Sequence, residues 1–193
     1  YFLVISDQDN TMKFITSMFF TLSFFHLVRY ADNECEGKRL PIPVNFIMDE
    51  FSNLGFIKDI NIKISTIRSR NLILIMAIQG IMQLQNRYPD GMWSELIGNC
   101  DTIVFLGTTE PESAEFISDR TGEVSIAVDT VMKQRSLFLP LDIQPNYRQS
   151  EGVGLRMLLT PDEVLRMAHD EMLIILRGNQ VLEAKKFDYT TNP

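Results

Sequence analysis

The chain has 193 residues, of which 45% are hydrophobic, and a formal net charge of -7. This length and composition predict a single globular domain with one core. No run of Lys and Arg exceeds two residues, so the chain carries no cationic stripe for a nucleic-acid backbone or an anionic membrane. Its two cysteines, Cys35 and Cys100, have neither a CxxC spacing nor a nearby His cluster, which argues against a structural zinc site and fits a reducing compartment.

The beginning of the chain suggests a piece of a longer protein. The first residues, YFLVIS, include neither Met nor a positively charged signal region, so we expect the chain to have been cut from something larger. The apolar stretch between Lys13 and Arg29 covers 15 residues and is interrupted by Ser, Thr and His. Since about 20 apolar residues are needed to cross a bilayer, this stretch predicts a buried helix.

Strand-like and helix-like runs alternate along the first half of the chain. The predicted elements are a strand at residues 2–6, a helix at about 12–30 with N-cap residues at 9–11, a strand at 44–48, a helix with Ile57, Ile60, Ile64 and Ile67 on one face, a strand at 72–78 and a helix at 80–88. The run at 72–78 is continuously apolar, which is typical of a strand covered on both faces.

The second half continues the alternation after a break at Pro89-Asp90-Gly91. We expect a strand at 101–107, a helix between a Thr109–Glu112 capping box and Gly122, a strand at 123–131, a long loop at about 133–154, and a C-terminal helix plus hairpin at 160–189 that opens with a Thr160–Glu163 capping box. Such alternation predicts an α/β fold with a mostly parallel sheet and helices on both faces.

Two adjacent carboxylates, Asp49 and Glu50, follow the apolar strand at 44–48. In open parallel sheets ligands lie at the carboxyl ends of strands, where Gln79 and Thr108-Thr109 also fall. An apolar strand that ends in Asp-Glu has the form of a Walker B element, in which Asp holds Mg²⁺ and Glu activates the water that attacks a γ-phosphate. The pair alone equally allows a helix cap, because acidic residues suit a helix N-terminus.

The two carboxylates belong to a longer motif. It lies within residues 40–88, LPIPVNFIMDEFSNLGFIKDINIKISTIRSRNLILIMAIQGIMQLQNRY. Asp49-Glu50-Phe51 is followed by Asn53 and Gly55, then by Arg68-Ser69-Arg70, and then by Gln79 with Gln83-Leu84. This stretch closely resembles the type IV secretion coupling proteins, the TraG-like conjugation ATPases. Weaker similarity continues at 108–123 and 159–189. Asn71 stands where the family more often has Gly, and Asn can adopt a positive φ if the site requires one.

The resemblance implies a RecA-like P-loop ATPase fold and a role for each residue of the motif. Asp49 would be the magnesium ligand and Glu50 the general base. Gln79 would sense the γ-phosphate, so that Asp49, Glu50 and Gln79 together bind ATP and Mg²⁺. Arg68 is the first candidate for an arginine finger that reaches a neighbouring subunit, and Arg70 is the second. The simpler reading of both arginines is a favourable interaction with the helix macrodipole.

One part of a nucleotide site is missing from the sequence, because no G-x-x-x-x-G-K-[ST] phosphate-binding loop occurs in it. We therefore expect residues 1–193 to be the second half of a RecA-like domain, from Walker B onward, without the Walker A strand. The resemblance implies that the intact protein is an ATPase, whereas the 193 residues alone are expected to be inactive.

The resemblance also implies the setting of the intact protein. It would be a homohexamer at the cytoplasmic face of the bacterial membrane, held there by an upstream segment, that moves relaxase and DNA substrates into a type IV secretion channel. The alternative function is a non-catalytic docking module that binds a relaxase or channel protein. A metal-dependent nuclease built on Asp49-Glu50 is a weaker alternative, because no further acidic cluster is evident.

Overall fold

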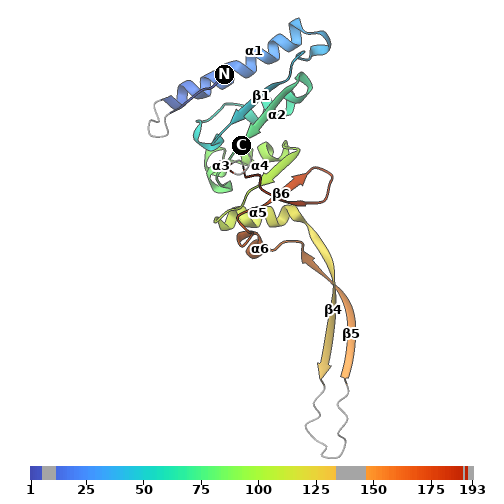
Figure 1. Ribbon diagram of the computed structural model, residues 1–193. Coiled ribbons are helices and arrows are strands. Elements are labelled where there is room, and N and C mark those ends of the chain that lie inside the picture. Colours follow the sequence, from blue (N-terminus) through green and yellow to red (C-terminus); the bar gives the residue numbers. More distant parts are fainter. Residues whose placement is uncertain (6–11, 134–146, 189, 191–193) are drawn as a thin grey trace, which may run out of the picture. The chain divides into compact units, whose positions relative to one another are not determined.

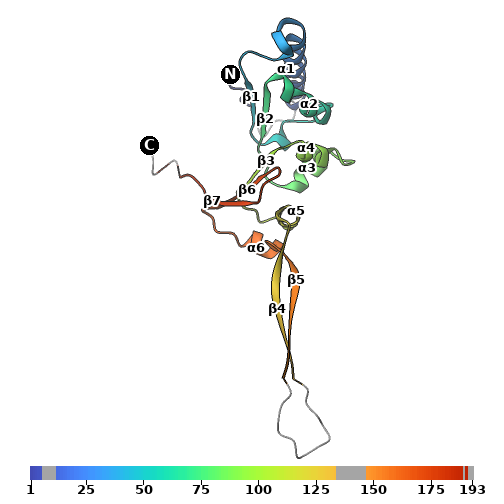
Figure 2. The ribbon, with the colours of Figure 1, turned by 90° about the vertical axis from the view of Figure 1, so that its right-hand side faces the viewer.

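A computed structural model describes residues 1–5, 12–133, 147–188 and 190. The chain divides into two compact units, which we describe separately. The first comprises residues 1–104 with 176–179, and the second comprises 105–175 with 180–193. Figures 1 and 2 show the elements of both units in two orthogonal views.

The first unit alternates helices with short strands, as the sequence predicts. Its elements are α1 (Lys13–Glu34), η2 (Glu36–Lys38), β1 (Val44–Met48), η3 (Phe51–Asn53), α2 (Ile60–Ile67), η4 (Arg68–Arg70), β2 (Leu72–Met76), α3 (Ile81–Arg87), α4 (Met92–Gly98) and β3 (Thr102–Phe105), the last of which ends at the border of the unit. Helix α4 was not predicted, and the N-cap residues expected at 9–11 lie outside the described residues.

Strands β1 and β2 form a parallel pair in which Val44 lies opposite Leu72 and Met48 opposite Met76. Helix α1 covers the face of this pair that carries Phe46, whose ring lies 4.5 Å from that of Phe24. The opposite face is open, since Ile47, Ile73 and Ile75 are 74%, 46% and 51% exposed. The expectation that residues 72–78 are covered on both faces is therefore wrong for this chain.

Helix α1 packs through a narrow stripe. Its buried residues are Thr16, Phe20, Phe24 and Ala31, and apolar side chains such as Phe14 and Phe25 on its other faces are exposed. The buried helix expected between Lys13 and Arg29 is thus buried along one stripe only. Among the described helices, α1 alone is long and apolar enough to cross a membrane, a test that core helices and signal sequences also pass.

The N-terminal residues Tyr1–Ile5 belong to no strand, although the pattern at 2–6 predicted one. The first four side chains are exposed, with Tyr1, Phe2 and Val4 almost entirely so, and Ile5 is half-buried. A strand needs a partner for its backbone N–H and C=O groups, and an apolar run alone does not supply that partner. The strand predicted there is therefore wrong for the described residues, and residue 6 lies outside them.

The second unit contains α5 (Pro111–Thr121), β4 (Glu123–Lys133), β5 (Tyr147–Met157), α6 (Pro161–Leu165), β6 (Glu171–Leu176) and β7 (Leu182–Lys185). Helices α5 and α6 supply much of its core, with Ala114, Ile117 and Val164 buried. The capping box at Thr160 and Glu163 is present, and β6 pairs with β7 as the predicted C-terminal hairpin. Helix α5 has Glu110, not Thr109, as its N-cap residue.

The long antiparallel hairpin β4–β5 is the main departure from the predicted elements. The two strands pair residue by residue from Glu123 opposite Met157 to Lys133 opposite Tyr147, and Figure 2 shows them as a twisted ribbon. The loop expected at about 133–154 is therefore wrong at Lys133 and at 147–154, while 134–146 lie outside the described residues. Strand β5 was not predicted because it contains Gly152 and Gly154, and strands are depleted in glycine.

Candidate functional site

The parallel pairing of β1 and β2 brings their carboxyl ends to the same edge. Two backbone hydrogen bonds extend the pairing beyond the strands, from Ala77 N–H to Met48 O (2.9 Å) and from Phe51 N–H to Ala77 O (2.8 Å). Asp49 and Glu50 follow the first strand, and Gln79 follows the second. The structure therefore brings the side chains of Glu50 and Gln79, which are 29 residues apart in the sequence, into hydrogen-bond contact. Asp49 precedes Glu50 at the same strand end.

The backbone turns sharply at Glu50. This residue has φ 47° and ψ 50°, in the left-handed region that residues other than Gly, Asn and Asp rarely adopt. Successive side chains of a strand point to opposite faces, so a straight continuation of β1 would separate Asp49 from Glu50. The left-handed turn at Glu50 directs its side chain toward Gln79, which follows β2.

Amide groups hold both oxygens of the Glu50 carboxylate. Gln79 donates from Nε2 to Oε1 at 2.8 Å, and Asn53 donates from Nδ2 to Oε2 at 2.9 Å. Gln83, on α3, donates in turn from Nε2 to the side-chain oxygen Oε1 of Gln79 at 3.1 Å. Asn53 and Gln83 were present in the sequence motif but were given no role. Their spacing was the available signal, three residues after Glu50 and four after Gln79.

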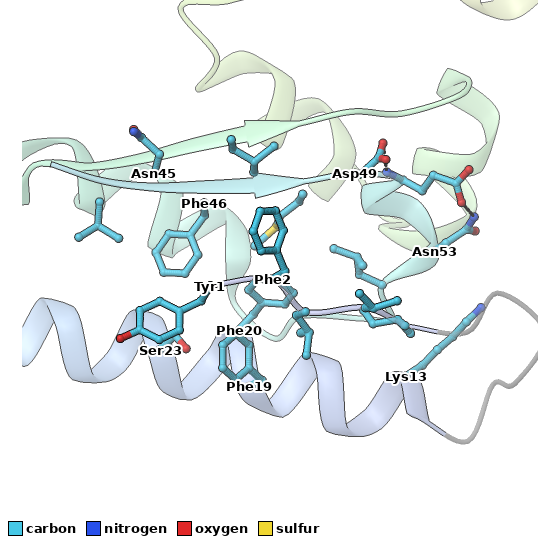
Figure 3. Close-up of a pocket in the computed structure, with 18 of the residues that line it drawn as sticks. Tyr1, Phe2, Lys13, Phe19, Phe20, Ser23, Asn45, Phe46, Asp49 and Asn53 are labelled. Atoms are coloured by element: carbon cyan, nitrogen blue, oxygen red, sulfur yellow. Dashed lines mark hydrogen bonds between the residues drawn. The ribbon is translucent and has the colours of Figure 1, made fainter.

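Asp49 lies beside this network and is exposed. Its Oδ1 accepts the backbone N–H of Glu50 at 3.1 Å, and Figure 3 shows Asp49 and Asn53 beyond the tip of β1. In the described part of the chain, no group of three His, Cys, Asp or Glu side chains could hold a metal ion. A single exposed carboxylate nevertheless suits Mg²⁺, which commonly keeps several waters and binds one or two carboxylates together with substrate phosphates.

Beneath the carboxylates, aromatic packing fixes the loop. Phe51 is fully buried and stacks on Tyr88, with ring centroids 5.4 Å apart and an interplanar angle of 7°. The Arg87 side chain donates from Nε to the carbonyl oxygen of Ser52 at 2.9 Å. Burial raises the pKa of Tyr88 to about 12, against opposing effects of the Ile57 N–H and the Arg87 charge. The end of α3 therefore anchors the segment that follows Glu50.

Gly55 closes the same loop against α1. It has φ 93°, and a Cβ added there would lie 2.9 Å from the carbonyl oxygen of Lys13. Any other residue would meet both the steric clash and the unfavourable backbone conformation. Gly55 therefore lets the turn after the carboxylates lie close against α1.

A cavity of about 1130 Å³ lies between α1, β1 and the N-terminal residues, with Asp49, Glu50 and Asn53 among its lining residues. Most of its wall is apolar, including Phe19, Phe20 and Phe46. Phosphate groups need several hydrogen-bond donors together with positive charge, and Lys13 is the one cationic residue among the described residues of this lining. The polar network at the strand ends, not this cavity, is therefore the candidate site.

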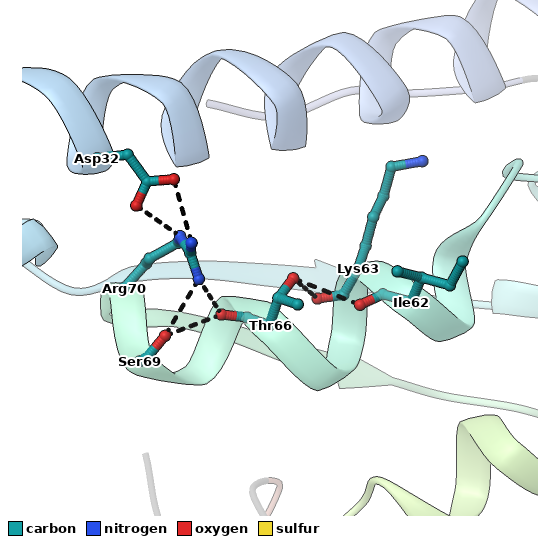
Figure 4. Close-up of polar contacts among 6 residues, drawn as sticks. All are labelled: Asp32, Ile62, Lys63, Thr66, Ser69 and Arg70. Carbon is teal, nitrogen blue, oxygen red and sulfur yellow. Dashed lines mark hydrogen bonds and ion pairs between the residues drawn. The ribbon is translucent and has the colours of Figure 1, made fainter.

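The two arginines of the motif lie in different surroundings. Arg70 pairs with Asp32 of α1 through two hydrogen bonds of 3.0 and 3.1 Å, and it also donates to Thr66 O (2.9 Å) and Ser69 Oγ (3.2 Å), as Figure 4 shows. Arg68 is 78% exposed and forms an ion pair of 2.7 Å with Asp101. Arg70 thus ties η4 to α1, whereas Arg68 projects from the surface.

Asn71 follows these arginines with φ 65° and ψ 32°, and its side chain donates to the carbonyl oxygen of Leu40 at 3.0 Å. The site does require a positive φ, and Asn71 adopts it in place of the Gly that the resembling family more often has. This left-handed residue ends η4 and leads the chain directly into β2.

Solved structures identify the fold. TrwB, a bacterial conjugative coupling protein, matches in a crystal form with sulphate with a TM-score of 0.68 and 16% identity, over 90% of this chain and 36% of that one. TrwB in complex with the ATP analogue ADPNP matches with a TM-score of 0.66 and 12% identity, over 91% and 36%. The chain therefore has part of the RecA-like α/β fold of these proteins, which confirms the predicted fold class.

Sequence comparisons give the family. The probable conjugal transfer protein TraG of Sinorhizobium fredii is 28% identical over 83% of this chain, and the protein VirD4 of Rhizobium radiobacter is 28% identical over 87%. The chain spans 24% of the length of each of these relatives. The family described as the TraM recognition site of TraD and TraG matches residues 43–169. The chain therefore belongs to the TraG/TraD family of type IV secretion coupling proteins.

Proposed function

We propose that this chain is the Walker B half of the ATP-driven motor of a coupling protein that recruits relaxase and DNA substrates and pumps them into a conjugation channel. Asp49 binds the Mg²⁺ that accompanies ATP. Glu50 accepts a proton from the attacking water, and Gln79 contacts the γ-phosphate. When bound, Mg²⁺ neutralises charge on the phosphates, and the residues of this chain orient the water and the metal.

The hydrogen bond between Gln79 and Glu50 is the observation that carries the proposal. It joins the ends of two neighbouring parallel strands, the position at which ligands bind in open α/β sheets. The Gln79 amide nitrogen has two donor hydrogens, so one that bonds to Glu50 leaves a second for a phosphate oxygen. A helix cap at Asp49-Glu50 would explain neither this contact nor the direction of the Glu50 side chain.

The surroundings of the arginines favour Arg68 as the residue that acts on the nucleotide of a neighbouring subunit. Its guanidinium is exposed, and its partner Asp101 is a surface carboxylate that forms a second, longer ion pair of 3.4 Å with Arg177. Exposed ion pairs of this kind contribute little to stability and exchange readily. Arg70, which was the second candidate, is engaged by Asp32 within its own chain.

The remaining features of the proposal concern the intact protein. We place it as a homohexamer at the cytoplasmic face of the bacterial membrane, anchored through a segment outside these 193 residues. Relatives named as conjugal transfer and type IV secretion system-coupling proteins support the process, and TrwB structures with ADPNP and with ADP and Mg²⁺ support the ligands. The exposed outer face of β1–β2 suits further structure packed upon it.

Substitution of the two carboxylates tests the proposal in the complete protein. Glu50→Gln keeps the side-chain shape but cannot accept a proton, so ATP should still bind while hydrolysis falls by about two to four orders of magnitude. Asp49→Asn removes charge from the metal site, so it should weaken the binding of magnesium nucleotide itself. Calorimetry measures binding and phosphate release measures turnover. Unchanged binding and turnover in both variants would leave the pair as a helix cap.

Arg68 is tested in mixed assemblies. Arg68→Ala should lower turnover by about three to five orders of magnitude if the arginine acts as a finger. Mixing these subunits with subunits inactivated at the phosphate-binding loop should restore part of the activity, since each subunit supplies what its neighbour lacks. Absence of rescue at every mixing ratio, with assembly verified by light scattering, would contradict action across the subunit boundary. The isolated 193-residue chain should show no measurable turnover.

A docking module is the second candidate function, and one finding favours it. The matched family is described as a recognition site for TraM, so a segment of this kind binds a partner protein in the proteins that gave the family its description. A purely docking chain would have no need of Asp49 and Glu50. Conjugative transfer that survives both substitutions would therefore favour docking over the motor.

A further inference from the structure

The Glu50 carboxylate is held from two sides, and one of its two partners has no assigned role. Gln79 reaches Oε1 from the end of β2, while Asn53 reaches Oε2 from η3, three residues after Glu50 itself. A free Glu side chain rotates about three single bonds, and each rotamer directs its oxygens differently. Two donors on opposite oxygens select one orientation of the carboxylate.

Asn53 is itself kept in place by its neighbours. Its backbone N–H donates to the carbonyl oxygen of Glu50 at 2.7 Å, which closes the turn. The two residues between them are buried, Phe51 at 0% and Ser52 at 4% exposure, whereas the Asn53 side chain is exposed. The turn is therefore stabilised by Phe51 and Ser52, and the Asn53 amide is free to serve the carboxylate.

Gln83 sets the direction of the other donor. Because Gln83 donates to the side-chain oxygen Oε1 of Gln79, the side-chain nitrogen Nε2 of Gln79 faces Glu50. The site thus contains three amides around one carboxylate: Gln83 and Gln79 are linked and reach Oε1, and Asn53 reaches Oε2 by itself. Asn53 provides the only one of these amides that comes from the same loop as Glu50.

We propose that Asn53 is a positioning residue for the general base. The inference rests on the proposed function, in which Glu50 accepts a proton from the attacking water. In this role Asn53 does not contact the nucleotide. Its side-chain amide fixes the Glu50 carboxylate so that the remaining lone pairs of the carboxylate face the water. A proton-accepting group must lie within hydrogen-bond reach of the proton that it abstracts, and a misdirected carboxylate loses that geometry.

A structural role for Asn53 makes different predictions. Asn is common in turns, where its side chain stabilises the local backbone. Loss of such a role would lower the melting temperature and the amount of folded protein without changing the turnover number of the folded fraction. A positioning role would lower kcat and leave KM and the affinity for nucleotide unchanged.

The experiment compares Asn53→Ala and Asn53→Asp in the complete coupling protein. Asn53→Ala removes the donor, so kcat should fall by about 10- to 100-fold, the usual loss for an outer partner of a reactive group. Asn53→Asp keeps the shape but places a second carboxylate beside Glu50, so the loss should be larger. Binding of a non-hydrolysable ATP analogue should be unchanged in Asn53→Ala. An unchanged kcat in both variants would overturn the inference.

Asn61 provides a matched control. It donates from Nδ2 to a carboxylate oxygen of Glu95 at 2.6 Å, on helices α2 and α4 of the same unit. Asn61→Asp therefore creates the same repulsion between two carboxylates away from the site. It should lower the melting temperature and leave kcat unchanged. If Asn61→Asp lowers kcat as much as Asn53→Asp does, the effect is one of general destabilisation and the inference fails.

A double-mutant cycle separates this inference from the proposed function. If Asn53 acts through Glu50, Asn53→Ala should have no further effect on turnover in a Glu50→Gln background. Equal fold losses in both backgrounds would overturn the positioning role while leaving Glu50 as the base. If Glu50→Gln alone leaves turnover unchanged, the proposed function fails, and the inference fails with it.

Discussion

The loop after β1 and the hairpin β4–β5 maintain their shapes in opposite ways. In the loop from Asp49 to Gly55, Phe51 is fully buried and Gly55 lies against the first residue of α1. In the hairpin, eleven pairs of residues face each other along the two strands. There Val153 and Leu155 are 82% and 72% exposed.

This difference shows where single side chains determine structure. The loop has few backbone hydrogen bonds of its own, so its course depends on particular residues and the contacts that they make. The hairpin depends on main-chain pairing, which many strand-forming residues sustain. Substitutions should therefore be costly in the loop and tolerated in the hairpin.

Phe51→Ala should produce the largest loss of stability. The substitution empties a fully buried site beside the Tyr88 ring, and truncation of a buried Phe typically costs about 3–5 kcal/mol. Phe56→Ala is the matched control, because Phe56 packs near the same ring but is 44% exposed. Urea denaturation of both variants measures the difference. Equal losses would show that burial of Phe51 is not what fixes the loop.

Tyr88 should make this region sensitive to alkaline pH. Its pKa is raised from 10.0 to about 12, chiefly by burial, so the folded state favours the neutral phenol. The resulting stabilisation is fully present below pH 10 and is lost as pH rises through about 12, a loss of roughly 2–3 kcal/mol. Tyr88→Phe has no phenol to ionise, so the difference in unfolding free energy between wild type and variant should change only in that window. A constant difference across it would contradict the buried state of the phenol.

Gly55→Ala should destabilise the loop by about 1–3 kcal/mol, because Ala at φ 93° is strained and its Cβ would meet the Lys13 carbonyl oxygen. Gly98→Ala is the control, since a Cβ there meets nothing within 4 Å and the residue has no positive φ. Differential scanning calorimetry should show a lower melting temperature for the first variant only. A neutral Gly55→Ala would indicate that α1 moves to accommodate the side chain.

Val153→Thr should change stability by no more than about 0.5 kcal/mol, as expected of an exposed position in a strand. Thr is a good strand former and keeps the branched side chain. Thermal unfolding followed by circular dichroism provides the measurement. A loss as large as that of Gly55→Ala would contradict the contrast, because it would mean that side chains also determine the hairpin.

Features encoded by neighbouring residues were predictable from the sequence. Strand β1 was predicted with its observed bounds, Val44–Met48, and the capping box of α6 was identified from Thr160 and Glu163. The positive φ of Asn71 was suggested by the Gly that the resembling family more often has at this position. In each case the information lies within a few residues of the feature.

Features that depend on distant residues were not predictable. Helix α4 has seven residues and buries only Leu96 and Ile97, which is too short a segment for a clear helical period. Strand β5 exists because it pairs with β4, and its glycines carry no strand signal. The pairing of Arg70 with Asp32, 38 residues earlier, likewise has no local pattern to reveal it.

The candidate site combines both kinds of information. Glu50 and Gln79 could be expected near each other because both follow parallel strands, and the structure joins them. The contact with Asn53 depends on the left-handed turn at Glu50, and a Glu in that conformation is too rare for sequence patterns to predict. The candidate residues were therefore visible in the sequence, whereas the geometry that brings them into contact was not.

The backbone conformation of Glu50 sets a conflict between folding and activity at one position. A residue with a Cβ in the left-handed region costs about 1–2 kcal/mol relative to its usual conformation, and Gly or Asn would relieve that cost. A library randomised at position 50 and screened only for folded protein should become enriched in Gly and Asn. The same library screened for conjugative transfer should return Glu, so the two screens would separate what the fold prefers from what the reaction requires.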